Sequence, residues 1–185
     1  MDNRKVKGTM LIDYVRMVRK IKDRDWDKYL KPEDWEIVNR KVLPSMWFPY
    51  DSFQRIGVAV FHEISMSNID TVRAFGKVFW NNLFSNVYGS IISDKNPVKC
   101  LERFALLRSA FFNFATHDIR KLGDTHVQSV ITVGELIPGL EPFCAQLQGG
   151  MDAIMDHADA KNPKIELIER EWKKDPATVF DITWE

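Results

Sequence analysis

Residues 178–184 read Thr-Val-Phe-Asp-Ile-Thr-Trp, and this stretch decides the fold class because its side chains alternate with a period of two. Phe180, Ile182 and Trp184 fall on one face of an extended chain, and Asp181 falls on the other. Successive side chains of a β-strand point to opposite faces, so the pattern predicts a strand with one buried face. Asp181 is then expected to meet solvent or a lysine.

Three further strands and one helix are predicted just before this strand. Alternating stretches at 113–122 and 125–133 flank a Leu-Gly-Asp sequence, which is typical of a hairpin turn. Residues 142–158 carry apolar side chains at helical spacing, and residues 164–171 alternate again before a turn at 173–176. The C-terminal part therefore predicts the order ββαββ, a four-stranded antiparallel sheet with one helix.

Two adjacent glycines, Gly149 and Gly150, lie in the middle of that predicted helix. Each costs about 1 kcal/mol relative to alanine in a helix interior. Glycine at such a position indicates that another part of the protein approaches the helix backbone closely. The neighbour could be the sheet or a partner chain, and in the second case both glycines would lie in an interface.

The first 111 residues are predicted to be helical. Asn96-Pro97 is typical of a helix start, with asparagine as the cap and proline in the first turn. The longest helix has a wide aromatic stripe and is expected to be central. The expected helices cover 8–22, 25–30, 32–40, 53–65, 69–92 and 97–111.

These patterns predict an α+β fold, with a helical N-terminal half packed on a C-terminal four-stranded antiparallel sheet. The chain has 185 residues, close to the usual size of one domain, and no stretch reads as a linker. We therefore expect one domain over residues 1–185, with a helical part at 1–111 and the ββαββ part at 112–185.

Aromatic side chains supply the candidates for a ligand pocket. Residues 43–51 contain two prolines and a dense aromatic group, and two interpretations stay open for them. The group could be a plug that fills a gap between helices, or one wall of a pocket. The candidate pocket residues are Trp47, Phe48, Phe75, Phe79, Trp80 and Phe84.

Composition and charge narrow the class of partner. Lysine plus arginine equals aspartate plus glutamate at 26 each, which argues against a dedicated nucleic-acid binder. A neutral balance offers little repulsion to self-association, so a homodimer is expected. No apolar run approaches the eighteen residues of a membrane span, and the N-terminus lacks the apolar segment of a signal peptide. A cytoplasmic location is expected.

Catalytic and metal-binding signals are weak. His117 and His126 lie on opposite arms of the first hairpin, and the strand register decides whether their imidazoles meet. If they meet they could bind a metal or sense pH, and if they do not they are separate surface histidines. Cys100 and Cys144 are interpreted as two buried thiols rather than a disulfide. No motif of a nucleophile elbow, phosphate loop or zinc protease occurs, so no enzyme activity is expected.

Several short landmarks give the chain a resemblance to a known family. They are Val6-Lys7-Gly8 at a helix start, Met-Trp-Phe-Pro-Tyr at 46–50, Phe-Gly-Lys-Val-Phe-Trp at 75–80, Asn96-Pro97, and Asp-Ile-Thr-Trp at 181–184. Together they resemble an uncharacterised bacterial family of the kind described in myxobacteria as a domain of unknown function. That family is related to the haem-NO-binding-like, four-vinyl-reductase and TRAPP Bet3-like folds.

The resemblance implies a fold that is often dimeric and that holds a small apolar molecule, a tetrapyrrole or an acyl chain between helices and sheet. Haem-NO-binding relatives hold haem with a helix histidine and a Tyr-x-Ser-x-Arg clamp. This sequence has no such motif, and residues 69–92 contain no histidine. Four-vinyl-reductase relatives often carry extra cysteines near the end, whereas none follows Cys144 here. No cofactor is therefore expected.

Two functions of different classes remain open from the sequence. The first is a non-catalytic sensory or regulatory module that binds a small apolar ligand in a pocket between helices and sheet. The alternative is a ligand-free dimeric interaction scaffold with a filled core. Six tryptophans and twelve phenylalanines fit both, because aromatic side chains build cores as readily as pockets.

Overall fold

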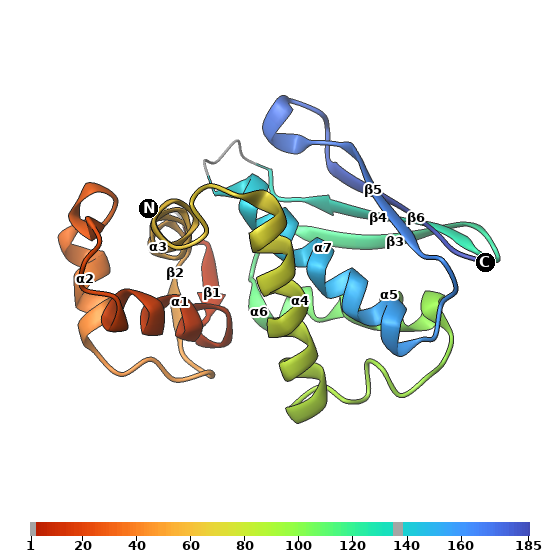
Figure 1. Ribbon diagram of the computed structural model, residues 1–185, viewed down its shortest axis with the longest axis horizontal. Coiled ribbons are helices and arrows are strands. Elements are labelled where there is room, and N and C mark those ends of the chain that lie inside the picture. Colours follow the sequence, from red (N-terminus) through yellow and green to blue (C-terminus); the bar gives the residue numbers. More distant parts are fainter. Residues whose placement is uncertain (1–2, 135–138) are drawn as a thin grey trace. The chain divides into compact units, whose positions relative to one another are not determined.

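The chain crosses between two compact units three times, so each unit is built from two separate stretches of sequence. A computed structural model describes residues 3–134 and 139–185 (Figure 1). Unit 1 takes the residues up to Ile69 and adds Ser109–Phe114. Unit 2 consists of Asp70–Arg108 and Ala115–Glu185. Whether both units unfold together as one domain stays a prediction.

Unit 1 surrounds a small two-stranded sheet with helices. Strand β1 (Lys5–Lys7) pairs antiparallel with β2 (Trp47–Pro49). The segment Ser109–Phe114 joins this sheet through an antiparallel bridge between Val6 and Phe112. The neighbouring Asn113 side chain bonds to the backbone just before and at the start of β1. Its Nδ2 donates to the Asn3 carbonyl (2.8 Å), and its Oδ1 accepts from the Lys5 amide (2.6 Å). The helices are α1 (Gly8–Lys20), the 3₁₀ helix η1 (Trp26–Lys28), α2 (Pro32–Asn39), α3 (Tyr50–Glu63) and α6 (Arg108–Phe111).

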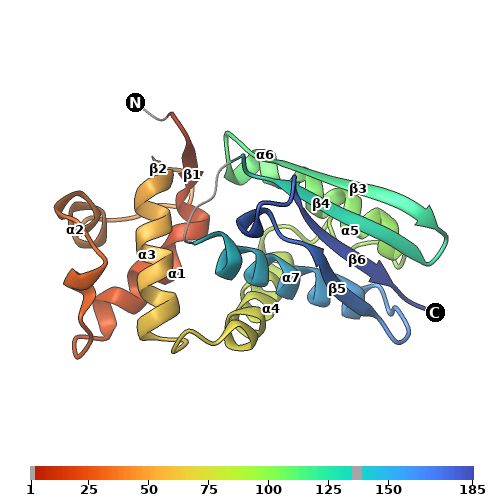
Figure 2. The ribbon, with the colours of Figure 1, turned by 90° about the horizontal axis from the view of Figure 1, so that it is seen from above.

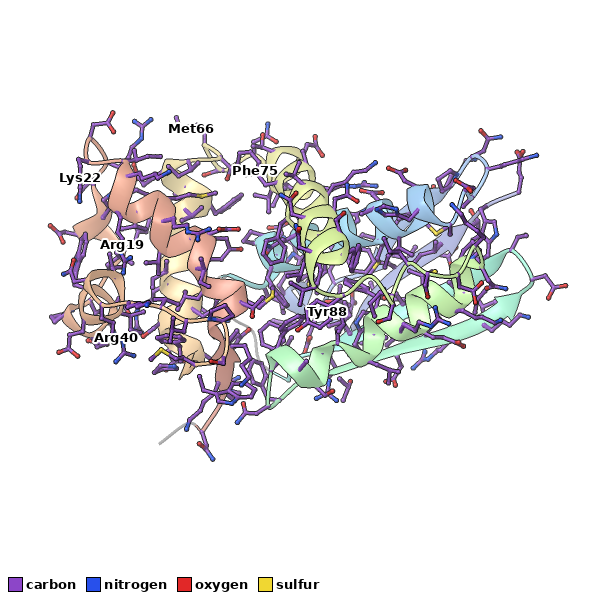
Figure 3. All side chains as sticks on the ribbon, turned by 90° about the horizontal axis from the view of Figure 1, so that it is seen from below. Arg19, Lys22, Arg40, Met66, Phe75 and Tyr88 are labelled. Carbon is purple, nitrogen blue, oxygen red and sulfur yellow. The ribbon has the colours of Figure 1, made fainter. Side chains whose placement is uncertain are left out.

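Charged side chains connect the helices of unit 1. The Arg55 guanidinium on α3 donates two hydrogen bonds to the fully buried Asp34 carboxylate on α2, at 2.6 and 2.8 Å. Burial raises the pKa of Asp34, but the hydrogen bonds from Arg55, the Lys31 amide and Ser52, with the Arg55 charge, together outweigh that effect and lower the pKa below its usual value. Arg19 on α1, labelled in Figure 3, donates to the backbone carbonyls of Val38 and Arg40. These bonds hold α1, α2 and α3 together.

Unit 2 contains the four-stranded antiparallel sheet that the sequence predicts. Its order is β3-β4-β6-β5, and every neighbouring pair is antiparallel. Residues 178–183 of the alternating stretch form β6, which is one of the two inner strands. The strands are β3 (Thr116–Gly123), β4 (His126–Thr132), β5 (Lys164–Glu169) and β6 (Thr178–Thr183).

Helices α5 (Pro97–Leu106) and α7 (Leu140–His157) cover one face of this sheet, as Figures 1 and 2 show. Helix α4 (Ile69–Asn86) crosses α7 at close range. We call the face under these helices the covered face; it includes His117, Ser129, Ile131, Phe180 and Ile182. The opposite face, called the polar face, includes Arg120, His126, Gln128, Asp181 and Glu166.

A buried carboxylate fixes the end of β4. Glu171 lies on the 3₁₀ helix η2 (Glu171–Lys173) between β5 and β6. Its two oxygens accept hydrogen bonds from the amides of Val133 (2.9 Å) and Gly134 (2.6 Å). Gly134 has a φ of +84°, a left-handed conformation that glycine adopts without a steric cost. The carboxylate therefore accepts hydrogen bonds from the amides of Val133 and Gly134, which follow the last residue of β4 and, among the residues described, have no partner in the sheet.

The α+β class and the ββαββ order are confirmed, and the differences lie in helix ends and in one missed sheet. Helix α4 ends at Asn86 rather than at residue 92, because the amides of Val87 and Tyr88 both bond to the Leu83 carbonyl. The helix expected over 97–111 breaks at Leu107 into α5 and α6. The Asn96 side chain caps α5 as predicted, accepting from the Lys99 amide. Residues 47–49, to which the sequence assigns neither helix nor strand, form β2.

Among the residues described, none of the helices combines the length and the apolar character that crossing a membrane requires.

Candidate functional site

An aromatic cluster lies between the helices and the sheet of unit 2. Trp80 and Phe84 on α4 meet Phe104 on α5, with ring centroids 4.8 Å and 6.1 Å from that of Phe104. The Phe104 ring in turn stands edge-on to the His117 imidazole on β3, at 5.7 Å. Phe79 extends the cluster outward and is 5.2 Å from Trp80. We call these five residues the aromatic cluster.

Local sequence spacing explains how the cluster forms. Trp80 and Phe84 are four residues apart on α4, so they share one face of the helix. Phe104 is on the buried face of α5, the helix that packs on β3. His117 points to the covered face because it stands opposite Ile131 in the β3–β4 ladder. The edge-to-face contacts at 4.8–6.1 Å are geometries in which aromatic rings attract one another.

His117 is the polar group of the cluster. Its Nε2 forms a hydrogen bond of 2.8 Å with the hydroxyl of the buried Ser129 on β4. Burial lowers the pKa of His117 to about 4, and the nearby Arg108 charge acts in the same direction. The imidazole is therefore neutral at physiological pH. A base with so low a pKa beside a buried hydroxyl is poorly suited to activating a nucleophile.

His126 has a different environment on the polar face. Its Nε2 bonds to the Asp181 carboxylate at 2.9 Å, and the Gln128 amide donates to the same oxygen at 3.1 Å. Burial raises the pKa of Asp181, but the hydrogen bonds from His126 and Gln128 outweigh it, so the net shift is downward. Asp181 therefore has a histidine and an amide as partners. Its side chain is 25% exposed, so of the two expected neighbours it meets solvent and not a lysine.

The two hairpin histidines do not come together. His117 is opposite Ile131 near one end of the β3–β4 ladder, and His126 pairs with Gly123 at the other end. They also project from opposite faces of the sheet. Within residues 3–134 and 139–185, no group of three or more histidine, cysteine or acidic side chains is placed to hold a metal ion.

The predicted pocket residues divide between the two units. Trp80 and Phe84 are buried in the aromatic cluster, and Phe79 lies at its edge. Phe75, one turn earlier on α4, is 45% exposed (Figure 3). In unit 1, Phe48 is fully buried in the core, whereas Trp47 is 40% exposed with the Lys7 amine 4.3 Å from its ring centre. Phe48 thus fills space in the core of unit 1, as the plug interpretation expects, whereas Trp47 lies at the surface.

Gly149 and Gly150 contact α4 of the same chain. A Cβ at Gly149 would lie 2.2 Å from the Arg73 carbonyl oxygen and 2.5 Å from the Lys77 amide. A Cβ at Gly150 would lie 2.6 Å from the Trp80 ring. The sequence indicates a close neighbour correctly but attributes it to the sheet or a partner chain. The neighbour is α4, so these glycines do not form an exposed interface.

An ion pair strengthens the same helix crossing. The Arg73 guanidinium on α4 donates two hydrogen bonds of 2.6 Å to the Asp152 carboxylate on α7. One turn further along both helices, the Lys77 amine is 2.5 Å from Asp156. The helix that carries Trp80 and Phe84 is therefore fixed to α7, whose other contacts reach the sheet. Sequence reasoning missed this connection, because Arg73 and Asp152 are 79 positions apart and no sequence pattern pairs them.

Both cysteines are free thiols in buried positions. Burial raises the pKa of Cys144 to about 12, and burial also raises the pKa of Cys100. The thiolate is the reactive form of cysteine, so neither residue has the character of a nucleophile at neutral pH.

No family model matches the sequence, and no curated protein matches it. Solved structures do match the fold. The Fe(II) unliganded H-NOX protein from K. algicida has a TM-score of 0.67 at 11% identity, covering 97% of this chain and 96% of that chain. The H-NOX protein from S. oneidensis in the Fe(II)NO ligation state has a TM-score of 0.66 at 14% identity, covering 97% and 99%.

A mutant H-NOX protein from T. tengcongensis has a TM-score of 0.63 at 15% identity and covers 97% of both chains. Identities this low establish the fold alone, and membership of the myxobacterial-type family stays a prediction. The α+β architecture described above is thus that of the haem-NO-binding-like fold.

Proposed function

We propose that this chain is a non-catalytic sensory or regulatory module that binds a small apolar ligand between the helices and the sheet of unit 2, at the aromatic cluster. The likeness to H-NOX structures supports a sensory, ligand-binding role in general terms. The aromatic cluster supports the choice of place within the unit.

The observation that carries the proposal is a neutral imidazole among aromatic rings. Small-molecule sites are mostly apolar and contain a few polar groups that orient the ligand. His117 meets this description, because its ring contacts Phe104 and its depressed pKa keeps it uncharged. Strongly shifted pKa values are also more frequent at functional sites than elsewhere. The proposal assigns to the ligand the ring nitrogen Nδ1, which is not the atom that bonds to Ser129.

A ligand at this place would have to displace a ring, since the cluster rings stand at contact distance from one another. Phe79 is the member at the edge of the cluster and the natural one to move. Movement of Phe79 or Trp80 would shift α4, on which both residues lie. The Arg73–Asp152 ion pair would transmit that shift to α7. Occupancy could in this way be reported by a change in the helix pair.

Native mass spectrometry of the purified chain, followed by denaturation to release any small molecule, tests this function. We expect the wild type to carry a small molecule that appears on denaturation. Phe79→Ala should lose it, because the substitution removes one wall of the cluster. Phe75→Ala is the matched control, since it makes the same change on the same helix at an exposed side chain. A wild type without ligand, or equal loss in both variants, would contradict the proposal.

The alternative function, a ligand-free dimeric scaffold, is favoured by one observation. Trp80, Phe84 and Phe104 are almost completely buried, which is what a filled core requires. The same spectra separate the alternatives, because a dimer mass with no released molecule supports the scaffold. A homodimer is part of both proposals and is reported by the same measurement.

A further inference from the structure

Haem is the ligand that the haem-NO-binding-like fold suggests first, and the donor atoms of this chain do not suit it. We infer that this protein binds neither haem nor any other ligand through a metal, and that its ligand is a metal-free organic molecule. This inference rests on the proposed function and narrows its ligand class. The inference is argued from the hydrogen bonds, the exposure and the pKa values of the histidines and cysteines, the residues that most often ligate haem iron.

Three of the four histidines use Nε2 within unit 2. His117 bonds to the Ser129 hydroxyl at 2.8 Å, His126 to the Asp181 carboxylate at 2.9 Å, and His157 to the Asn81 side chain at 3.0 Å. An axial histidine must direct a free ring nitrogen at the iron while the other nitrogen bonds to the protein. In these three residues Nε2, the nitrogen further from the backbone, is already engaged, so ligation of iron through Nε2 would require the ring to leave its partner. The other nitrogen, Nδ1, is adjacent to the carbon that joins the ring to the Cβ, so a porphyrin bound there would be crowded by the chain to which the histidine belongs.

His62, the fourth, lies in the last turn of helix α3 in unit 1. Its Nδ1 is 2.7 Å from the Ser67 hydroxyl, in a contact exposed to solvent. The ring stacks on Tyr29 with centroids 5.4 Å apart and planes at 15°. Haem sites are largely apolar and exclude water from the iron, so this solvent-exposed helix end is a poor place for the axial ligand.

The two thiols cannot readily take the axial role. A cysteine ligates iron as the thiolate, and metal binding must therefore deprotonate it. The pKa of Cys144 is raised to about 12 by burial, and the pKa of Cys100 is also raised by burial. The Cys100 thiol moreover donates to the Asp94 carbonyl at 3.1 Å.

The propionate groups of a porphyrin need cationic partners, and Arg73 and Arg103, on the helices that carry the aromatic cluster, already bond within the protein. Arg73 donates two hydrogen bonds to Asp152, and these part-buried bonds connect α4 to α7. Arg103 on α5 donates to the Ser90 carbonyl and lies 3.6 Å from Asp94. Recruiting either to a propionate would break an existing helix contact.

These observations describe the ligand by its chemistry. The cluster offers aromatic faces from α4 and α5 and one neutral imidazole, so it suits an uncharged apolar or aromatic molecule with one hydrogen-bonding group. Size follows from the same geometry. The rings of the cluster touch one another, and a porphyrin would have to part α4 from α5, whereas a smaller molecule need replace only one ring.

A hemin titration of the full chain tests the inference, with the S. oneidensis H-NOX protein treated in parallel as the positive control. Absorption spectra would be recorded after reduction and after addition of NO, and bound iron would be measured after desalting. We expect the control to saturate at one equivalent with a sharp Soret band that shifts with NO. We expect this chain to give only a weak, unsaturable hemin signal and far less than one iron per chain.

Saturable one-to-one hemin binding with a protein-dependent Soret band would overturn the inference. The variants His62→Leu, His117→Leu, His126→Leu and His157→Leu would then identify the ligand by loss of that band. Near-ultraviolet circular dichroism of the wild type before titration ensures that folded protein is tested. The two failures are distinguishable. Saturable hemin binding overturns this inference and leaves ligand binding by the chain in place, whereas release of no molecule in native mass spectrometry overturns the proposed function and, with it, the organic ligand inferred here.

Discussion

The two faces of one sheet give histidine two different chemistries. On the covered face, His117 lies under α5 against Phe104, bonds to a buried hydroxyl and has a pKa of about 4. On the polar face, His126 bonds to a carboxylate that water also reaches. The residues occupy neighbouring strands of one hairpin. The side to which each points decides its burial and its hydrogen-bond partner.

The comparison teaches that the face to which a strand position points matters more for the environment of a histidine than the residue type does. A shift of one residue in either strand would exchange the two environments, because side chains alternate with a period of two. The four substitutions or titrations below separate the faces, beginning with the largest expected effect.

Gly149→Ala should have the largest effect, because it disturbs the helix layer above the covered face. The added Cβ would lie 2.2 Å from the Arg73 carbonyl oxygen and 2.5 Å from the Lys77 amide, so backbone must move. We expect a loss of about 3 kcal/mol or more in the free energy of unfolding, as measured by urea denaturation.

Gly57→Ala on α3 is the matched control for that change. It also replaces a helical glycine, but its Cβ would lie 3.4 Å from the nearest atom, a carbon of the Tyr14 ring. We expect no loss there, and a gain of up to about 1 kcal/mol from helix propensity. Equal losses in the two variants would show that the close contact between α4 and α7 is unimportant for stability.

The second prediction concerns pH and the covered face. The folded pKa of His117 lies below its usual value of 6.5, at about 4, so the unfolded chain binds more protons between those values. The contribution of His117 to the free energy of unfolding is therefore fully present above pH 6.5. It is lost as the pH falls from 6.5 to about 4, and below pH 4 this residue causes no further loss. At 1.36 kcal/mol per pKa unit the full loss is about 3 kcal/mol.

His117→Leu should remove this part of the pH dependence, whereas His126→Leu, the same change on the polar face, should leave it in place. The measurement is the free energy of unfolding at intervals between pH 7 and pH 4 for the three proteins. If the two variants retain the same slope as the wild type, burial of His117 does not govern acid stability.

Ser129→Ala tests the hydrogen bond below the aromatic cluster. It leaves the buried His117 Nε2 without its hydroxyl partner, and an unsatisfied buried polar group costs about 1–3 kcal/mol. Gln128→Ala, one residue away on the polar face, removes a bond that water can replace and should cost about 0.5 kcal/mol or less. Urea denaturation at pH 7 measures both, and a larger loss for Gln128→Ala would reverse the comparison.

Asp181→Asn should have the smallest effect. The Asp181–His126 pair is partly exposed, and such pairs contribute at most about 1 kcal/mol. The pKa of Asp181 is lowered in the folded protein, so its contribution is present above the unfolded value near 3.9 and is lost as the pH falls through the folded value. Wild type and variant should thus differ slightly at pH 6 and converge in acid. Differences that grow in acid would exclude this assignment.

Much of the fold is readable from the sequence, because it depends on periodicity. The alternation around Phe180 and the helical spacing of Trp80 and Phe84 predict a strand and a helix, and both form. Asn96-Pro97 predicts the start of α5 by local capping chemistry. These signals involve residues within a few positions of one another, so no tertiary information is needed.

The site is harder to read, since its contacts join distant residues. Phe104 and His117 meet only because α5 folds onto β3, and Ser129 becomes a partner only through the strand register. The β1–β2 pair escapes prediction for a related reason. Each strand has three residues, which is too short for an alternating pattern, and one of them ends in Pro49.

The divided sequence of unit 1 has a consequence for the nascent chain on the ribosome. Its first strand depends on Phe112 and on Asn113, whose side chain bonds to the Asn3 carbonyl and to the Lys5 amide. The chain continues into unit 2 at Asp70 and returns only at Ser109. At translation rates of about 5–20 residues per second, the N-terminal helices must wait on the order of several seconds for that last piece. During the wait, the edge of β1 is open to chaperones or to another copy of the chain.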